Sequence, residues 1–193
     1  RVQPTADFVG TVFFSRVSNV AAEVDGRVEK LLFEEGRRVE KGQVLAALNT
    51  DLLDLGISRK RALFEEARVE LAQARKDLER MEALYRQKSV AYTVYDDTRF
   101  KVLRLEKRAG ALEAALARDR LLRKKMQIRA PFSGVVLKQS AEVGEWVGPG
   151  STVATLAGDR QIDVVVEVPE EILSFLAEDD QISVRAGGGA RTC

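Results

Sequence analysis

The sequence contains no histidine, and its single cysteine, Cys193, is the last residue. The missing histidine excludes a Ser-His-Asp triad and removes a common ligand of zinc sites. One cysteine cannot form a disulfide within the chain or a thiolate metal cluster. The residues therefore predict neither a metal site nor a cofactor, and they give no sign of an enzyme.

Long hydrophobic runs and a charge imbalance are also missing. No apolar run reaches the roughly 18 residues of a membrane-spanning helix. Lys and Arg number 31 against 30 Asp and Glu, and this formal charge of +1 predicts no nucleic acid partner. The first residues do not form a signal peptide, so we expect any export signal or membrane anchor to lie outside this sequence. The length of 193 residues predicts one or two domains.

One short segment occurs twice, because residues 26–48 match residues 134–156 without a gap. The matched pairs are Gly26 with Gly134, Val28 with Val136, Lys30 with Lys138, Glu34 with Glu142, Gly36 with Gly144, Val39 with Val147, Gly42 with Gly150, Ala46 with Ala154 and Leu48 with Leu156. Neither copy is long enough to bury a core alone. The repeat therefore predicts that residues 19–50 and 127–158 face each other in one β-sandwich related by a pseudo-two-fold axis.

Between the two copies the apolar spacing changes to alternating steps of three and four residues, which is typical of a coiled coil. The first series is Leu53, Ile57, Lys60, Phe64, Ala67, Leu71, Ala74, Leu78, Met81 and Tyr85. The second is Val102, Leu105, Ala109, Leu112 and Leu116. Lys60 interrupts the first series, and we interpret it as a long side chain that carries its ammonium group out to water.

These two series predict an antiparallel helical hairpin over residues 51–126. Asp51 and Asp54 suit the start of the first helix. Thr93 with Asp96 has the spacing of a capping box and predicts the start of the second, and Pro131 excludes helix beyond it. Each helix should be about 50 Å long.

The two ends of the chain are predicted to form a partial β-barrel from residues 1–18 and 159–185. Strands are expected near 8–20, 162–168 and 181–184, with a short helix after Pro169. The glycine-rich residues 186–193 favour a flexible tail. The predicted fold class is α+β, with a split sandwich, an inserted coiled-coil hairpin and a partial barrel.

A split β-unit with a helical hairpin inserted at its midpoint resembles the periplasmic adaptor proteins, or membrane fusion proteins, of tripartite efflux pumps. The segments that carry the resemblance are 26–28, 35–45, 128–134 and 143–147. The resemblance implies a lipoyl/biotinyl-like sandwich. It also implies a periplasmic protein associated with the inner membrane, which bridges an inner-membrane transporter and an outer-membrane channel and forms rings, commonly of six adaptors.

The same resemblance implies that the hairpin tip docks on the channel. In adaptors of the resistance–nodulation–division type the tip often shows Arg, then Leu four residues on, then Ser seven further. Arg80 and Leu84 fit this pattern, whereas position 91 is Ala91 and Ser89 comes two residues early. All three tyrosines, Tyr85, Tyr92 and Tyr95, fall in the same region. These seven residues are the candidate docking site, and Arg80 and Leu84 are expected to be exposed.

Other functions fit the sequence less well. A lipoyl or biotin carrier needs a lysine on a tight turn between the two half-units, and here helices occupy that place. An enzyme needs a second reactive group at a fixed spacing from its carboxylates, and none is evident. The heptads are also compatible with a coiled coil that has a structural role alone. Within the adaptors, the alternative is a partner of an ABC-type or type I secretion exporter, which shares the split sandwich.

Overall fold

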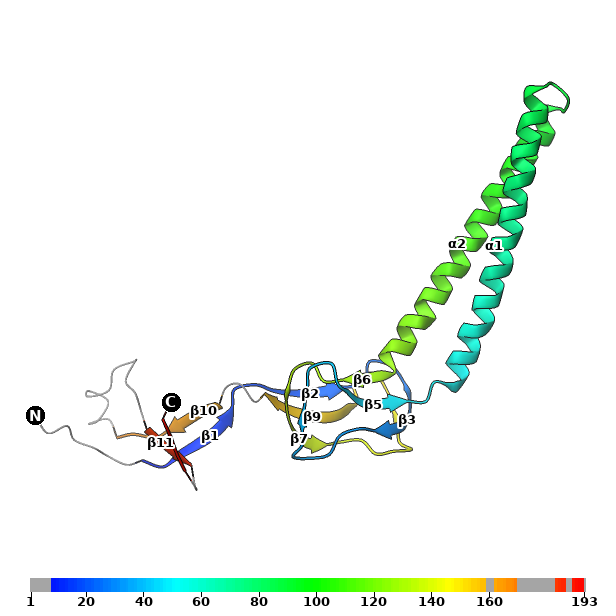
Figure 1. Cartoon of the computed structure of the whole chain (residues 1–193). Coiled ribbons are helices and arrows are strands. Elements are labelled where there is room, and N and C mark those ends of the chain that lie inside the picture. Colours follow the sequence, from blue (N-terminus) through cyan, green and yellow to red (C-terminus); the bar gives the residue numbers. More distant parts are fainter. Residues whose placement is uncertain (1–7, 159–161, 170–182, 187–188, 193) are drawn as a thin grey trace, which may run out of the picture. The chain divides into compact units, whose positions relative to one another are not determined.

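A computed structural model describes residues 8–158, 162–169, 183–186 and 189–192 (Figure 1). The chain divides into two compact units. One is Val17–Gly158, and the other combines Arg1–Arg16 with Asp159–Cys193. The first unit holds the sandwich and the hairpin, so both copies of the repeat belong to one unit.

The sandwich has two four-stranded sheets. The first has the order β2 (Val17–Ala21), β9 (Thr152–Gly158), β7 (Gly134–Gln139), β4 (Arg38–Val39), and the second has the order β6 (Gln127–Arg129), β5 (Val44–Leu48), β3 (Gly26–Leu31), β8 (Trp146–Val147). Strands β9, β7 and β4 of the first sheet have their repeat counterparts, β5, β3 and β8, at the same places in the second, and β2 and β6, which precede the repeated segments, occupy the remaining place in each. The sheets are therefore images of each other under the sequence repeat.

The hydrogen bonds follow the same symmetry. Gly26 lies opposite Val147 in the β3–β8 pair, and Gly134 lies opposite Val39 in the β7–β4 pair. The predicted single sandwich with pseudo-two-fold symmetry is confirmed. However, neither copy forms a complete sheet by itself. The short edge strand β4 of the first copy pairs with β7 of the second copy, and β8 of the second copy pairs with β3 of the first. This exchange ties the two copies together by backbone hydrogen bonds as well as by the core.

The core repeats as well. The largest fully buried side chains are four repeat pairs, Val28 with Val136, Val39 with Val147, Leu45 with Val153 and Leu48 with Leu156. Burying each contributes about 1.5–3 kcal/mol relative to exposure. Gly134 is fixed by a close approach, because a Cβ atom there would lie 2.0 Å from the carbonyl oxygen of Ala157. The glycines of the repeat thus serve its turns and its packing.

The hairpin consists of α1 (Asp51–Arg86) and α2 (Tyr92–Lys125), which lie side by side (Figure 1). Both seams face each other as predicted, and their best-buried members are Ala67 and Ala74 on α1 and Leu116 on α2. At 1.5 Å per residue each helix is about 50 Å long. The sandwich holds the base of the hairpin, where the backbone N–H of Leu48 donates to the carbonyl of Met126 at 2.9 Å.

Four ion pairs cross from α1 to α2 and fix their register: Asp54 with Arg123, Lys60 with Asp119, Glu70 with Arg108, and Arg75 with Glu106. The hydrogen bond from Arg123 holds the pKa of Asp54 below its ordinary value, and Asp54 raises that of Arg123.

The structure corrects the interpretation of Lys60. Its Nζ atom lies 2.5 Å from Oδ2 of Asp119, which sits on the α2 seam and is only 8% exposed. The ammonium therefore turns toward the partner helix and compensates a carboxylate on the seam, instead of reaching for water. Sequence periodicity showed Lys60 on the seam but gave no sign of its partner.

Among the described residues of the second unit, two strand pairs are present. β1 (Gly10–Phe14) pairs antiparallel with β10 (Ile162–Val166), and β11 (Ser183–Ala186) pairs with β12 (Gly189–Thr192). The β1–β10 pair joins the two chain ends as the sequence predicts. β12 lies where a flexible tail was expected, and the structure pairs it with β11 instead. The helix predicted after Pro169 falls outside the described residues.

Candidate docking site at the hairpin tip

The loop that closes the hairpin, residues 87–91, begins with a turn built on a left-handed residue. Lys88 has φ 57°, a conformation usually left to glycine. Its N–H donates to the carbonyl of Tyr85, and the N–H of Ser89 donates to that of Leu84. This is the Schellman pattern of helix termination. The tip has no glycine, so a lysine occupies the left-handed position and presents its side chain there.

The second helix begins without a side-chain cap. The predicted capping box at Thr93 is wrong, because α2 starts at Tyr92 and Ala91 occupies the N-cap position. Thr93 lies inside the first turn, where it cannot serve as the N-cap. Alanine is among the poorest residues at that position because it offers no acceptor to the first N–H groups. The start of α2 therefore depends on tertiary packing at the tip.

That packing comes from the three tyrosines. Tyr85 at the end of α1 stacks on Tyr95, with ring centroids 5.2 Å apart and planes 9° apart. Tyr92 tilts against both, at 5.9 Å from Tyr85 and 6.3 Å from Tyr95. The rings close the end of the seam, while Tyr92 stays 55% exposed. The sequence placed the three tyrosines close together along the chain, and the structure shows that their rings contact one another in one aromatic cluster.

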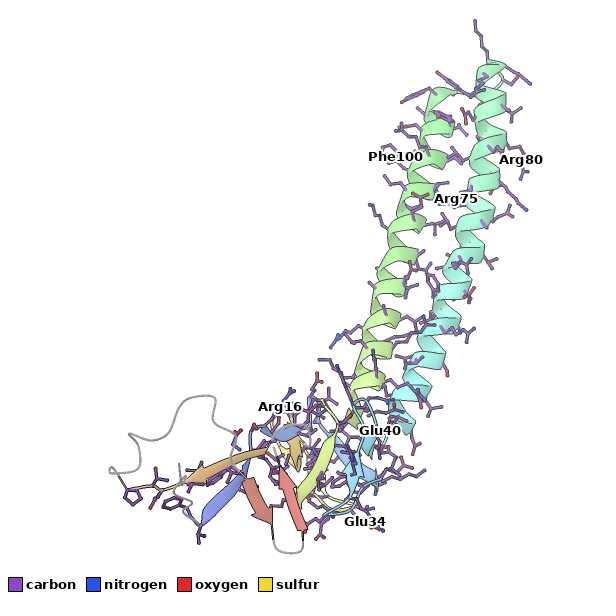
Figure 2. The ribbon with its side chains drawn as sticks, turned by 60° about the vertical axis from the view of Figure 1, so that its left-hand side comes forward. Arg16, Glu34, Glu40, Arg75, Arg80 and Phe100 are labelled. Atoms are coloured by element: carbon purple, nitrogen blue, oxygen red, sulfur yellow. The ribbon has the colours of Figure 1, made fainter. Side chains whose placement is uncertain are left out.

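Arg80 and Leu84 differ in their surroundings. Arg80 points outward from α1, as Figure 2 shows, and its Nη2 atom lies 2.9 Å from Oδ1 of Asp77. The expected exposure of Leu84 is wrong, because Leu84 is half-buried. The N–H of Ser89 also returns to the carbonyl of Leu84, which ties this residue into the closing turn. Leu84 therefore belongs to the support of the tip.

The site thus has an exposed part and a supporting part. Ser89 and Ala91 are exposed in the loop, next to Lys88 and Tyr92, whereas Leu84 and Tyr95 are half-buried beneath them. Arg80 lies about 7 Å down the helix axis from Tyr85. Lys88 belongs to this candidate site, and sequence reasoning missed it. A tip loop without glycine was the available signal, because some residue in it had to adopt the left-handed conformation.

Neither a metal-ligand cluster nor a membrane-spanning helix is present among the described residues. Over the residues that the structure describes, no group of three His, Cys, Asp or Glu side chains could hold a metal ion. No helix there is both long and apolar enough to span a membrane. The tip presents an exposed aromatic and basic surface.

Comparison with known proteins assigns this architecture to a protein family. A family model described as the CzcB-like, barrel-sandwich hybrid domain matches residues 16–158, which include both halves of the sandwich and the whole hairpin. The chain belongs to this family of membrane fusion proteins, the periplasmic adaptors. The resemblance drawn from the sequence and the predicted fold class are both confirmed.

Individual relatives agree with the family. The chain is 31% identical over 180 residues to the efflux pump periplasmic linker BepF of Brucella suis, with 91% of this chain and 43% of BepF covered. It is 27% identical over 172 residues to the multidrug resistance protein MdtA of Klebsiella pneumoniae, with 88% and 42% covered. The chain thus spans about two fifths of the length of these relatives.

Among solved structures, the crystal structure of MacA from Actinobacillus actinomycetemcomitans has the same fold. The TM-score is 0.57 at 16% identity, with 86% of this chain and 56% of that chain covered. At this identity the likeness supports the fold alone.

Proposed function

We propose that this chain is the hairpin-bearing part of a non-catalytic periplasmic adaptor. The adaptor would link an inner-membrane efflux transporter to an outer-membrane channel and dock on the channel through the hairpin tip. Family membership supports the adaptor role, and one of the relatives is itself named an efflux pump periplasmic linker. The observation that carries the docking role is the exposed tyrosine and lysine surface at the far end of the hairpin.

The length of the hairpin supports a function at its tip. A helix pair about 50 Å long leaves most of its surface in water, so it adds little to the stability of a small sandwich. The ion pairs between the helices hold the register from the base of the hairpin to Arg75, and the tyrosine cluster closes its far end. Such a rigid hairpin is useful because it carries its tip to a distance, and distance matters only where the tip contacts another molecule.

The local structure of the tip supports the same conclusion. Lys88 in the left-handed region costs about 1 kcal/mol relative to glycine, and Ala91 as the N-cap costs about as much relative to serine. Either cost could be removed by one substitution. Sequences tend to break such local rules where a side chain serves function. The retained Lys88 is therefore best explained as part of a contact surface.

The composition of the exposed part fits a protein partner. Tyrosine and arginine are enriched where protein interfaces bind most strongly. Tyr92 presents a ring and a hydroxyl group, while Lys88 and Arg80 present cations within reach of carbonyl or carboxylate groups. Such a mixture favours a modest, partly polar interface, as expected where subunits of an exporter assemble.

The finer features of the proposal come from the family. Arg80 and Leu84 favour a transporter of the resistance–nodulation–division type. Ala91 departs from that pattern and keeps an ABC-type or type I secretion exporter as the alternative. We also propose a periplasmic location with association to the inner membrane, and a ring of copies, commonly six in this family.

The tip is tested by two substitutions that leave the seam intact. Arg80→Glu and Tyr92→Asp should each abolish export by the complete exporter, because they place a negative charge in the contact surface. The thermal melting temperature should stay within a few degrees of the parent, because Arg80 is exposed and loss of the Tyr92 ring, which is 55% exposed, leaves the stacked Tyr85–Tyr95 pair in place. Substrate accumulation in cells and melting of the purified variants are the two measurements.

The matched controls are Arg80→Lys and Tyr92→Phe at the same positions. They keep the cation and the ring, and they should retain most of the export. Normal export by both Arg80→Glu and Tyr92→Asp, at parental protein levels, would place the channel contact elsewhere on the chain.

A further inference from the structure

A hollow lies at the base of the hairpin, where α2 passes into the sandwich. This basal hollow has a volume of about 310 Å³, and its walls include Ala21 on β2, Arg129 on β6, and Leu121 and Lys124 on α2. Figure 1 shows β2 and β6 below the end of α2, and β6 contacts both of the other elements. All three elements belong to the unit Val17–Gly158, so one compact unit forms the whole hollow.

Two open strand edges border the basal hollow. β2 and β6 each stand at the end of their sheet, so among the described strands each has a neighbour on one side only. The N–H of Ala130 donates to the carbonyl of Gln43 at 2.9 Å, and its carbonyl accepts the N–H of Gly42 at 2.8 Å. Because these groups alternate sides along an antiparallel strand, the N–H of Arg129 is directed to the open edge. A ligand in the hollow would find a backbone donor there.

The basal hollow has an apolar side. Val20 and Ile128 line it, and both are buried members of the sandwich core, at 7% and 5% exposure. Leu121 stands beside them on α2 with 55% of its surface exposed. Covering such a leucine is favourable, because apolar surface is removed from water. The hollow therefore favours a ligand that brings an apolar group to Leu121.

The other side of the hollow is positively charged. Lys124, Lys125 and Arg129 line it, and Glu23 is the one carboxylate among the lining residues. Glu23 pairs with Lys125, with Oε2 and Nζ 2.7 Å apart. Arg129 donates to the neutral carbonyl of Gly42 at 2.7 Å, so its positive charge is not compensated there. Among the described residues no carboxylate pairs with Lys124. Three cations against one carboxylate leave an excess of two positive charges.

The surrounding sequence increases this positive charge. Residues 118–129 carry six basic side chains and one acidic side chain, although the formal charge of the whole chain is only +1. The C-terminal end of α2 opposes an anion, because the helix dipole is equivalent to about half a negative charge there. An excess of two cationic side chains outweighs this effect. The hollow therefore attracts an anion.

We propose that the basal hollow binds a small amphiphilic anion, such as a carboxylic acid with a medium-length apolar chain. The acidic group would lie between Lys124 and Arg129, and the chain would cover Leu121. The volume is at the lower end of the range of about 300–1,000 Å³ for small-molecule pockets. An added peptide strand fits less well, because β6 has only three residues to pair with it. This ligand site goes beyond the adaptor function and does not depend on it.

Titration calorimetry of the purified chain with octanoate tests the site. We expect saturable binding of one octanoate with a dissociation constant of about 1 mM or lower. Butanoate should bind at least about tenfold more weakly, because each buried CH₂ group contributes about fourfold in affinity. Octanol, which has the chain without the charge, should also bind at least about tenfold more weakly. The absence of saturable octanoate binding up to about 10 mM would overturn the proposal.

Charge reversal at Lys124 locates the ligand. Lys124→Glu should weaken octanoate binding at least about tenfold and leave the melting temperature unchanged, because Lys124 is exposed. Lys124→Arg keeps the cation and should bind within about threefold of the parent. Lys107→Glu is the matched control, since Lys107 is an exposed lysine of α2 about 25 Å along the helix from Lys124. Equal loss of affinity in Lys124→Glu and Lys107→Glu would contradict a site in the basal hollow.

A second variant should strengthen binding. Glu23→Gln removes the carboxylate that pairs with Lys125 and leaves this lysine for the ligand, so octanoate should bind about threefold more tightly or better. A residue that only supported the fold would not produce this gain. Backbone amide NMR should show octanoate-induced shifts at Ala21 and Arg129. Unchanged affinity in Glu23→Gln together with shifts confined to other parts of the chain would overturn the proposal.

Lipid vesicles separate a soluble acid from a membrane surface. Phosphatidylglycerol vesicles supply an anionic surface, and phosphatidylcholine vesicles are the neutral control. We expect the chain to co-sediment with neither at physiological salt, since surface charges alone are screened there. Co-sedimentation with phosphatidylglycerol vesicles that Lys124→Glu abolishes, without octanoate binding, would overturn the proposal and assign this surface to a membrane. All of these measurements use the purified chain, so their outcome is independent of export by the tip variants.

Discussion

Val136→Asp is expected to unfold the sandwich, with a loss of at least about 4 kcal/mol in the free energy of unfolding. Val136 is 1% exposed, and its backbone carbonyl accepts the N–H of Gly36 in the strand exchange. A carboxylate at this place would be buried without a cation. Small domains have only about 5–15 kcal/mol of stability in total. Circular dichroism melts and urea titration would measure the loss.

The matched control for this prediction is Leu137→Asp. Leu137 follows Val136 in β7, so its side chain points to the other face of the sheet, and it is 42% exposed. This control should lose less than about 1 kcal/mol. Val28→Asp should reproduce the severe effect, since Val28 is the repeat counterpart of Val136. Equal losses from Val136→Asp and Leu137→Asp would refute the assignment of the core.

Lys60→Met is expected to destabilise the hairpin by about 2–3 kcal/mol. It leaves Asp119 as an uncompensated carboxylate on the seam, and breaking a fully buried pair costs about 3–5 kcal/mol. The value is lower here because the Lys60 side chain is 31% exposed. Lys60→Met combined with Asp119→Leu should recover most of the loss, because an apolar pair fits the seam. Hydrogen exchange of the α1 and α2 amides would resolve the hairpin from the sandwich.

The control for Lys60 is another cross-helix pair. Arg75→Met breaks the ion pair with Glu106, whose side chains are 61% and 39% exposed, and should cost less than about 1 kcal/mol. If Lys60→Met has no larger effect than Arg75→Met, Asp119 finds enough water at the seam, and the pair does not fix the register of the hairpin.

Much of the fold could be predicted because it depends on two regular patterns in the sequence, an internal repeat and a heptad spacing of apolar residues. The repeat that matches Gly26 with Gly134 led to one sandwich, and the heptads from Leu53 to Tyr85 led to the hairpin. The exchange of β4 and β8 could not be predicted, since either pairing of two similar half-units satisfies the same apolar pattern. The Lys60–Asp119 ion pair could not be predicted either, because a single charged residue on a seam does not identify its partner on the other helix.

The tip was predicted in composition but not in detail. Sequence alone gathered Tyr85, Tyr92 and Tyr95, whereas their stacking depends on how the helices end. The left-handed Lys88 and the uncapped Ala91 go against local preference, and tertiary packing decides both. Rules based on local propensity therefore failed where the proposed contact surface lies.

Photo-cross-linking from Tyr92 is the most direct test of the adaptor's docking. A photoreactive phenylalanine analogue would replace Tyr92 in cells that export normally, and the cross-linked proteins would be identified by mass spectrometry. The same analogue at Val143, an exposed residue of the sandwich, is the control. We expect an outer-membrane channel protein to be captured from Tyr92 and not from Val143. Capture of the channel from Val143 but not from Tyr92 would contradict docking through the hairpin tip.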